Sequence, residues 1–186
     1  MKKKISILVS GEGTTMKHIF NAINHGILSD FLINFVISDR NCNAIKYASK
    51  KNVKVFSFNK GKFLSKNISK MLETDIPYII VLSGFLSILD EEFCKKWSKK
   101  VINIHPSLLP KYGGKGMYGM NVHKKVIKKK EKFSGATVHY VTKNVDSGTI
   151  ILKKSCKILP KETYQSLFKK VSKIEKEILI KSIKNF

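Results

Sequence analysis

The stretch Lys4–Ser10 (KISILVS), followed by Gly11–Thr15 (GEGTT) and then by Met16–Ile27, decides the fold of this chain. The first part is an almost continuous apolar run with the length of a buried strand, and the last part carries apolar residues at helical spacing. Two glycines lie between them, where the chain has to turn. The sequence therefore opens with a strand, a glycine loop and a helix, the unit from which parallel sheets are built.

The same alternation continues along the chain. Further strands are predicted at 33–38, 53–58, 78–83, 101–104, 135–141 and 149–154, with helices at 43–51, 62–74, 90–99, 120–130 and 162–184. Strands that alternate with helices favour an α/β fold with a mainly parallel sheet flanked by helices. The last two strands, near 135–154, are close enough to form an antiparallel hairpin at one edge. No repeat, linker or break in composition interrupts the pattern, so residues 1–186 are expected to form one domain.

The composition is strongly basic, with a formal net charge of +23 in 186 residues. Such a charge is typical of a protein that binds nucleic acid or an anionic membrane. However, Arg40 is the only arginine among the 36 basic residues, and the lysines are spread over the whole chain beside abundant Ile and Asn. Proteins that read bases and phosphates are usually rich in arginine. We therefore favour A/T-rich codon drift as the origin of the charge, with a functional role as the alternative.

Cysteine usage and the length of the apolar runs bear on the compartment. Cys42, Cys94 and Cys156 are far apart and odd in number, which predicts neither a disulfide framework nor a paired metal site. The apolar run before Gly11 is shorter than most signal-peptide cores, and no run approaches the roughly 20 residues that cross a bilayer. We expect a cytoplasmic protein with no metal and no membrane partner.

The glycine loop at 11–15 has two interpretations. Its backbone N–H groups, at the start of a helix, could bind a phosphate. The loop lacks the Gly-Lys-Thr of a Walker motif and the third glycine of a dinucleotide fingerprint. A tight turn with Thr14 or Thr15 capping the helix remains the alternative.

The segment Val101–Tyr112 (VINIHPSLLPKY) is more informative. Because side chains alternate along a strand, Asn103 and His105 lie on one face, at the carboxyl end of a strand where parallel sheets place their ligands. An amide and an imidazole in this arrangement suit a reaction that develops negative charge on a carbonyl oxygen. A polar strand edge is the alternative.

Asp146 lies in the turn-rich stretch Thr142–Gly148, between two predicted strands. A carboxylate brought near His105 would favour the imidazolium and raise its pKa. An Asx turn is the alternative role for an aspartate before Ser-Gly. His139, in the preceding strand, could line the same site. His18, His25 and His123 fit helix-surface or packing positions.

Five stretches in order carry a resemblance to a known family: Ser10–Thr14, Val81–Leu89, Ile102–Pro110, Gly135–Val141 and Val145–Ile151. With them the chain resembles the folate-dependent phosphoribosylglycinamide formyltransferases. The resemblance implies a Rossmann-like sheet and transfer of the formyl group of 10-formyltetrahydrofolate, as co-substrate, to glycinamide ribonucleotide in purine biosynthesis. It also implies direct attack by the amine, with Asn103 and a protonated His105 stabilising the oxyanion and Asp146 holding the imidazole.

The resemblance also implies the site residues, position by position. The catalytic set is Asn103, His105 and Asp146. The ribonucleotide set is Gly13, Thr14, Thr15, Ser172 and Glu175. The folate set is Lys60, Leu86, Ser87, Ile88, Leu89, Asn103, His139, Thr142, Lys143, Asn144, Val145 and Asp146, in which Lys60 is aligned with a family arginine that holds the folate tail.

The chain departs from the family pattern at Thr14-Thr15, where the family often has Ser-Asn, and at the insertion-like stretch 113–120. Related alternatives are a methionyl-tRNA formyltransferase, which would add a C-terminal RNA-binding domain, and a formyltetrahydrofolate hydrolase, which usually has an N-terminal regulatory domain. A basic nucleic-acid-binding protein is the alternative from another class, but no reader motif supports it. We expect small-molecule substrates, no nucleic acid, and a monomer or homodimer.

Overall fold

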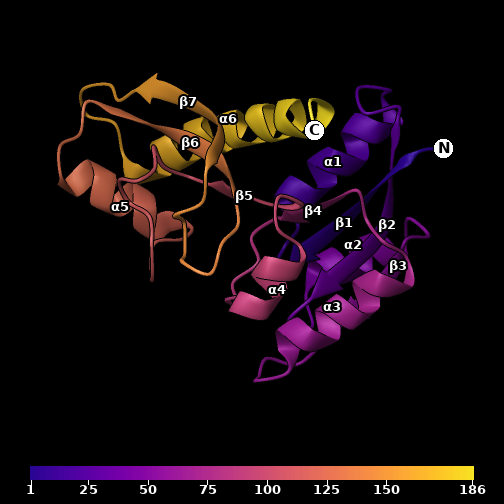
Figure 1. Cartoon of the computed structure of the whole chain (residues 1–186). Coiled ribbons are helices and arrows are strands. Elements are labelled where there is room, and N and C mark those ends of the chain that lie inside the picture. The colour runs from indigo at the N-terminus through magenta and orange to yellow at the C-terminus, as the bar shows by residue number, and fades with distance from the viewer. The chain divides into compact units, whose positions relative to one another are not determined.

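The computed structural model describes all 186 residues, and the chain divides into two compact units. The first comprises Met1–Asn103 with Phe186, and the second Ile104–Asn185. The boundary falls inside one strand, so that strand belongs to both units (Figure 1). A single domain over residues 1–186 stays a prediction.

The first unit is a parallel sheet with connecting helices. Its elements are β1 (Lys3–Val9), α1 (Thr14–Asn24), β2 (Phe31–Ser38), α2 (Asn43–Ser49), β3 (Lys54–Ser57), α3 (Leu64–Thr74), β4 (Ile79–Leu82), α4 (Glu91–Lys96) and the start of β5 (Val101–His105). The strands lie in the order β3-β2-β1-β4-β5, and every neighbouring pair is parallel. The order reverses beside β1, which makes the ends of β1 and β4 a switch point of the kind where open α/β sheets bind ligands.

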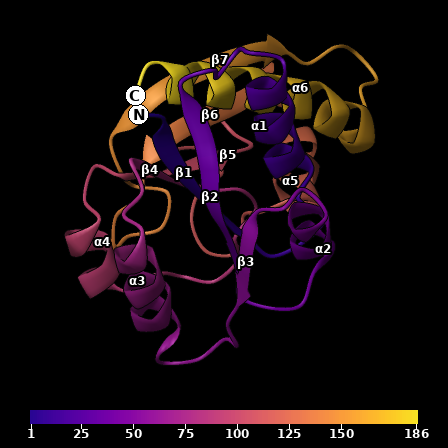
Figure 2. The same cartoon turned by 90° about the vertical axis from the view of Figure 1, so that its right-hand side faces the viewer.

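Helices cover both faces of this sheet, with α1 and α2 on one side and α3 and α4 on the other (Figure 2). The strands between them are apolar because both faces are buried. Ile5, Ile7 and Leu8 of β1 are fully buried, and so is the whole of β4 except for a slight exposure of Leu82. The loops after β1, β2 and β4, which are described below, leave the carboxyl ends of these strands.

The second unit contains the end of β5, then α5 (Met120–Lys128), β6 (Phe133–Tyr140), β7 (Ile150–Lys157) and α6 (Tyr164–Lys184). β6 and β7 are antiparallel, with Phe133 opposite Lys157 and a register shift between Val138 and His139. The long helix α6 runs along the β6–β7 pair (Figure 1). Its start is capped by Thr163, whose hydroxyl accepts from the Ser166 amide at 3.2 Å.

The Rossmann-like α/β class and the antiparallel edge hairpin are thus confirmed. The helix expected over 16–27 begins at Thr14 and ends at Asn24, just before Gly26, which has a φ of +75°. The strand expected over 149–154 extends to Lys157, because the β6 ladder continues to Phe133. None of the helices combines the length and the apolar character that crossing a membrane requires.

His123 is a packing residue rather than a surface one. On α5 it is 0% exposed, and neither ring nitrogen has a hydrogen-bond partner in the protein. The ring packs edge-to-face on Phe168 of α6, with centroids 5.5 Å apart. Burial, and to a lesser degree the charge of His105, lowers the pKa of His123 to about 4.

This burial predicts a pH-dependent stability. Because the folded pKa lies below that of the unfolded chain, the unfolded state takes up the proton first as the pH falls. The free energy of unfolding should therefore be highest above about pH 6.5 and fall by about 3 kcal/mol through this group as the pH drops toward 4. Urea unfolding at pH 7 and pH 4.5 measures the loss, which His123→Leu should reduce and His25→Gln, at an exposed site, should not.

Candidate active site

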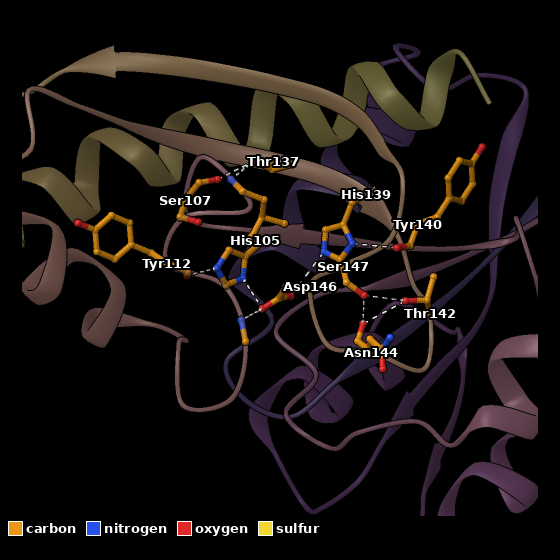
Figure 3. A network of polar contacts seen from close by, with 12 residues as sticks. His105, Ser107, Tyr112, Thr137, His139, Tyr140, Thr142, Asn144, Asp146 and Ser147 are labelled. Atoms are coloured by element: carbon orange, nitrogen blue, oxygen red, sulfur yellow. Dashed lines mark hydrogen bonds and ion pairs between the residues drawn. The ribbon is translucent and has the colours of Figure 1, made fainter.

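His105 is held at the end of β5 by the loop that follows it. Its Nε2 lies 2.8 Å from the carbonyl oxygen of Tyr112 (Figure 3). A carbonyl oxygen only accepts, so Nε2 carries the hydrogen and Nδ1 has the lone pair when the ring is neutral. The other ring nitrogen, Nδ1, lies 3.5 Å from Oδ2 of Asp146. The structure thus brings Asp146 and His105 together, a contact that spacing along the sequence does not establish.

The net shift in the pKa of His105 is downward, although Asp146 raises it as expected. The side chain is 5% exposed, and burial lowers its pKa below the usual value. Asp146 and the Tyr112 carbonyl act in the opposite sense and raise the pKa, but burial is the largest cause. At neutral pH, His105 is consequently a neutral base beside a carboxylate, rather than a standing imidazolium.

Asp146 lies between two histidines (Figure 3). Its Oδ1 is 3.6 Å from Nε2 of His139, while its Oδ2 faces His105 and accepts from the Gly114 amide at 2.8 Å. Burial would raise the pKa of Asp146, but the hydrogen bond with His139, the charge of His105 and the Gly114 amide together lower it. The carboxylate is thus ionised at neutral pH and available to stabilise a proton on His105.

Asp146 is a turn residue and a site residue at once. Its φ of +55° belongs to the left-handed region, which aspartate tolerates in turns. In the same loop the hydroxyls of Thr142 and Ser147 both donate to the carbonyl of Asn144, at 3.1 and 2.8 Å. These bonds shape the turn that directs the Asp146 carboxylate toward the two imidazoles (Figure 3).

Three contributions to this site do not follow from the sequence. The carbonyl of Tyr112 orients His105, and Gly114 donates to Asp146. At Gly113, an added Cβ would lie 2.6 Å from Leu109 Cδ2 and 3.1 Å from Asp146 Cβ, so a side chain there would displace Leu109 and press on Asp146. The sequence feature that could indicate these contributions is the pair of glycines directly after Tyr112, at the start of the insertion-like stretch 113–120.

Thr137 of β6 makes two hydrogen bonds to the segment Pro106–Pro110, which follows His105. Its hydroxyl donates to the carbonyl of Ser107 at 2.7 Å and accepts from the Leu109 amide at 3.1 Å. Ser107 in turn donates to the carbonyl of Lys111 at 2.6 Å. These bonds fix the backbone that leads to Tyr112, and through it the ring of His105.

The glycine loop lies in the first unit. Gly13 is the N-cap of α1, with φ +67°, and no side chain caps the helix, so capping by Thr14 or Thr15 is excluded. The loop packs on the start of α2, where the Ala44 amide donates to the carbonyl of Gly11 at 3.0 Å and Asn43 donates to Glu12 at 2.8 Å. The free amides at the first turn of a helix remain suited to an anion.

Gly13 cannot accept a side chain without loss of stability. A Cβ there would lie 2.7 Å from Ala44 Cβ and 2.9 Å from Met16 Cε, in a left-handed backbone. We expect Gly13→Ala to lower the free energy of unfolding by about 2 kcal/mol or more. Gly11→Ala is the control, because an added Cβ at that position meets nothing within 4 Å. Urea unfolding of both variants makes the comparison, and equal losses would contradict it.

The remaining predicted site residues divide between the units. Asn103, Lys60 and Leu86–Leu89 belong to the first unit, and Ser172 and Glu175 of α6 to the second. Leu86 and Ile88 are exposed, Ser87 is half-buried and Leu89 is buried. Burial raises the pKa of Glu175 to about 7, so this carboxyl group changes its charge near neutral pH. No group of three or more His, Cys, Asp and Glu side chains has an arrangement that could hold a metal ion.

Comparison with known proteins extends over nearly the whole chain. A family model described as formyl transferase matches residues 3–183. A phosphoribosylglycinamide formyltransferase of Haemophilus influenzae is 32% identical, with 99% of this chain and 87% of that protein aligned. The chloroplastic phosphoribosylglycinamide formyltransferase of Vigna unguiculata is also 32% identical, but this chain spans only 60% of that relative's length. The solved structure of a Coxiella burnetii phosphoribosylglycinamide formyltransferase has a TM-score of 0.90 at 31% identity, covering 99% of this chain and 86% of that one.

Proposed function

Because this chain belongs to the formyl transferase family, we propose that it transfers the formyl group of 10-formyltetrahydrofolate to the amine of glycinamide ribonucleotide. The relatives described above carry the name of this activity. The observation that carries the proposal is the buried group of His105, Asp146 and His139, in which a neutral imidazole has a carboxylate at 3.5 Å.

The proposed reaction needs one proton to move from one nitrogen to another. The amine of the ribonucleotide attacks the formyl carbon, a C–N bond forms, and the formyl oxygen becomes an oxyanion to which Asn103 donates. His105 takes the proton that the amine loses, and Asp146 stabilises the resulting imidazolium. His105 then gives the proton to the folate nitrogen as its bond to carbon breaks. A neutral His105 suits the first step, because only the neutral ring can accept.

The substrate contacts are part of the same proposal. The amides of Gly13, Thr14 and Thr15 would bind the phosphate of the ribonucleotide, and Ser172 and Glu175 its remaining polar groups. The folate would lie against the segments Leu86–Leu89 and Thr142–Asp146, with His139 beside it and Lys60 near its anionic tail. We also propose a cytoplasmic location, in keeping with three free cysteines.

An absorbance assay for loss of the formyl-folate tests the function. With wild-type protein, turnover should require glycinamide ribonucleotide. Equal turnover without the ribonucleotide would identify a hydrolase, and turnover only with methionyl-tRNA a tRNA formyltransferase. Either result would overturn the proposal.

A further inference from the structure

A buried carboxylate outside the proposed substrate contacts lies at the carboxyl end of β2. Asp39 directly follows this strand, and its side chain is 0% exposed. Arg40 donates two hydrogen bonds to this carboxylate, from Nε to Oδ1 at 2.8 Å and from Nη2 to Oδ2 at 2.9 Å. Arg40 is the only arginine in a chain that otherwise uses lysine, and lysine cannot form this planar fork.

Residues at the ends of two other strands also act on Asp39. The hydroxyl of Ser87, in the loop after β4, donates to Oδ2 at 2.6 Å. Burial would raise the pKa of Asp39, but the hydrogen bonds from Arg40, Ser87 and Ser10, the residue after β1, hold it at about 2. The carboxylate is therefore charged at neutral pH, and its bond with Ser87 joins the loop after β2 to the loop after β4, at the edge where this sheet would bind a ligand.

The loop after β4 is tied to the protein at three points. The Leu86 amide donates to Ser10 Oγ at 2.8 Å, Ser87 donates to Asp39, and the Asp90 amide donates to Ser65 Oγ at 3.0 Å. On either side of the tethered serine, Leu86 and Ile88 are 47% and 64% exposed. The serine thus faces the buried carboxylate while its two apolar neighbours present an open hydrophobic surface.

We propose that Asp39, with Arg40 as its counter-ion, is a positioning residue that holds Leu86 and Ile88 as the surface on which the folate ring packs. This inference rests on the proposed function and extends it to a residue that touches neither substrate. A charged acceptor with a fixed counter-ion holds the Ser87 hydroxyl more firmly than a neutral acceptor would. Asp39→Asn keeps the shape of this side chain but removes its charge.

The test uses Ser87→Ala and Asp39→Asn in the full chain, with Ser182→Ala as the matched control. Ser182 is a buried serine whose hydroxyl donates to the Ile178 carbonyl at 2.8 Å within α6, away from the Asp39 contacts. We expect the KM for formyl-folate to rise by about tenfold in the first two variants. The kcat and the KM for the ribonucleotide should stay within about twofold in Asp39→Asn, and the control should match the wild type.

Two measurements without turnover separate the possible failures. Amide hydrogen exchange at residues 86 and 87 should be faster in Ser87→Ala and in Asp39→Asn than in the wild type. Calorimetry should show that both variants bind tetrahydrofolate more weakly. If the wild type binds tetrahydrofolate and the folded variants bind it equally well, the positioning role is overturned. Equal changes in both KM values and in kcat would also overturn it. A wild type that binds no tetrahydrofolate would instead refute the proposed function.

Discussion

His105→Asn should reduce kcat at pH 7.5 by at least about a hundredfold, while the KM values of both substrates change little. The variant keeps a hydrogen-bond donor near the Tyr112 carbonyl but removes the nitrogen that would accept the proton of the amine. The pH dependence of the wild type should show the same group: because burial lowers the pKa of His105, the neutral base persists below pH 6.5. Steady-state kinetics from pH 5.5 to 8.5 measure both effects.

The control for this variant is His123→Leu, a second buried histidine that has no part in the proposed chemistry. The His123 ring is neutral at pH 7.5, so the kcat of His123→Leu at this pH should stay near the wild-type value. A folded His105→Asn variant with near-normal turnover would remove His105 from the mechanism.

Asp146→Asn should lower kcat by about tenfold to a hundredfold. Asp146 raises the pKa of His105 against the larger effect of burial, so removal of its charge should lower that pKa further. The neutral ring would then be present over a wider pH range but would be a weaker base, and its protonated form would lose its partner. The acidic limb of the pH profile should shift to lower pH while the plateau falls.

NMR titration of His105 in the two proteins isolates the charge effect from the chemistry. The pKa of the ring should be lower in Asp146→Asn than in the wild type. An unchanged value in the folded variant would show that the 3.5 Å contact does not exist in solution. Asp146 would then keep only its role in the turn.

The sequence predicts the elements well where hydrophobic periodicity decides them. The apolar runs of β1 and β4 and the helical spacing of α1 require burial between layers, and the structure has them in that arrangement. The ends are less predictable, because they depend on single residues such as Gly26 with its positive φ. The edge hairpin follows from the short spacing of its two strands.

Sequence patterns point to candidate site residues, but they do not predict the electrostatics of the site. A strand pattern places Asn103 and His105 on one face, and the turn residues around Asp146 indicate a loop. The sign of the His105 pKa depends on how deeply the ring is buried, which no local pattern reports. The Tyr112 carbonyl and the Gly114 amide are backbone groups, so their residue types carry little information about their roles. Asp39 looks like an ordinary loop residue until its partners from two other loops are known.

The most direct test follows the formyl carbon itself. Folate carrying a ¹³C-labelled formyl group is mixed with glycinamide ribonucleotide and wild-type protein, and the product carbon is identified by NMR. We expect the label to appear as a formamide on the ribonucleotide, with one equivalent of tetrahydrofolate formed, and we expect His105→Asn to slow this transfer by at least about a hundredfold. Label recovered as free formate, at a rate independent of the ribonucleotide, would contradict it.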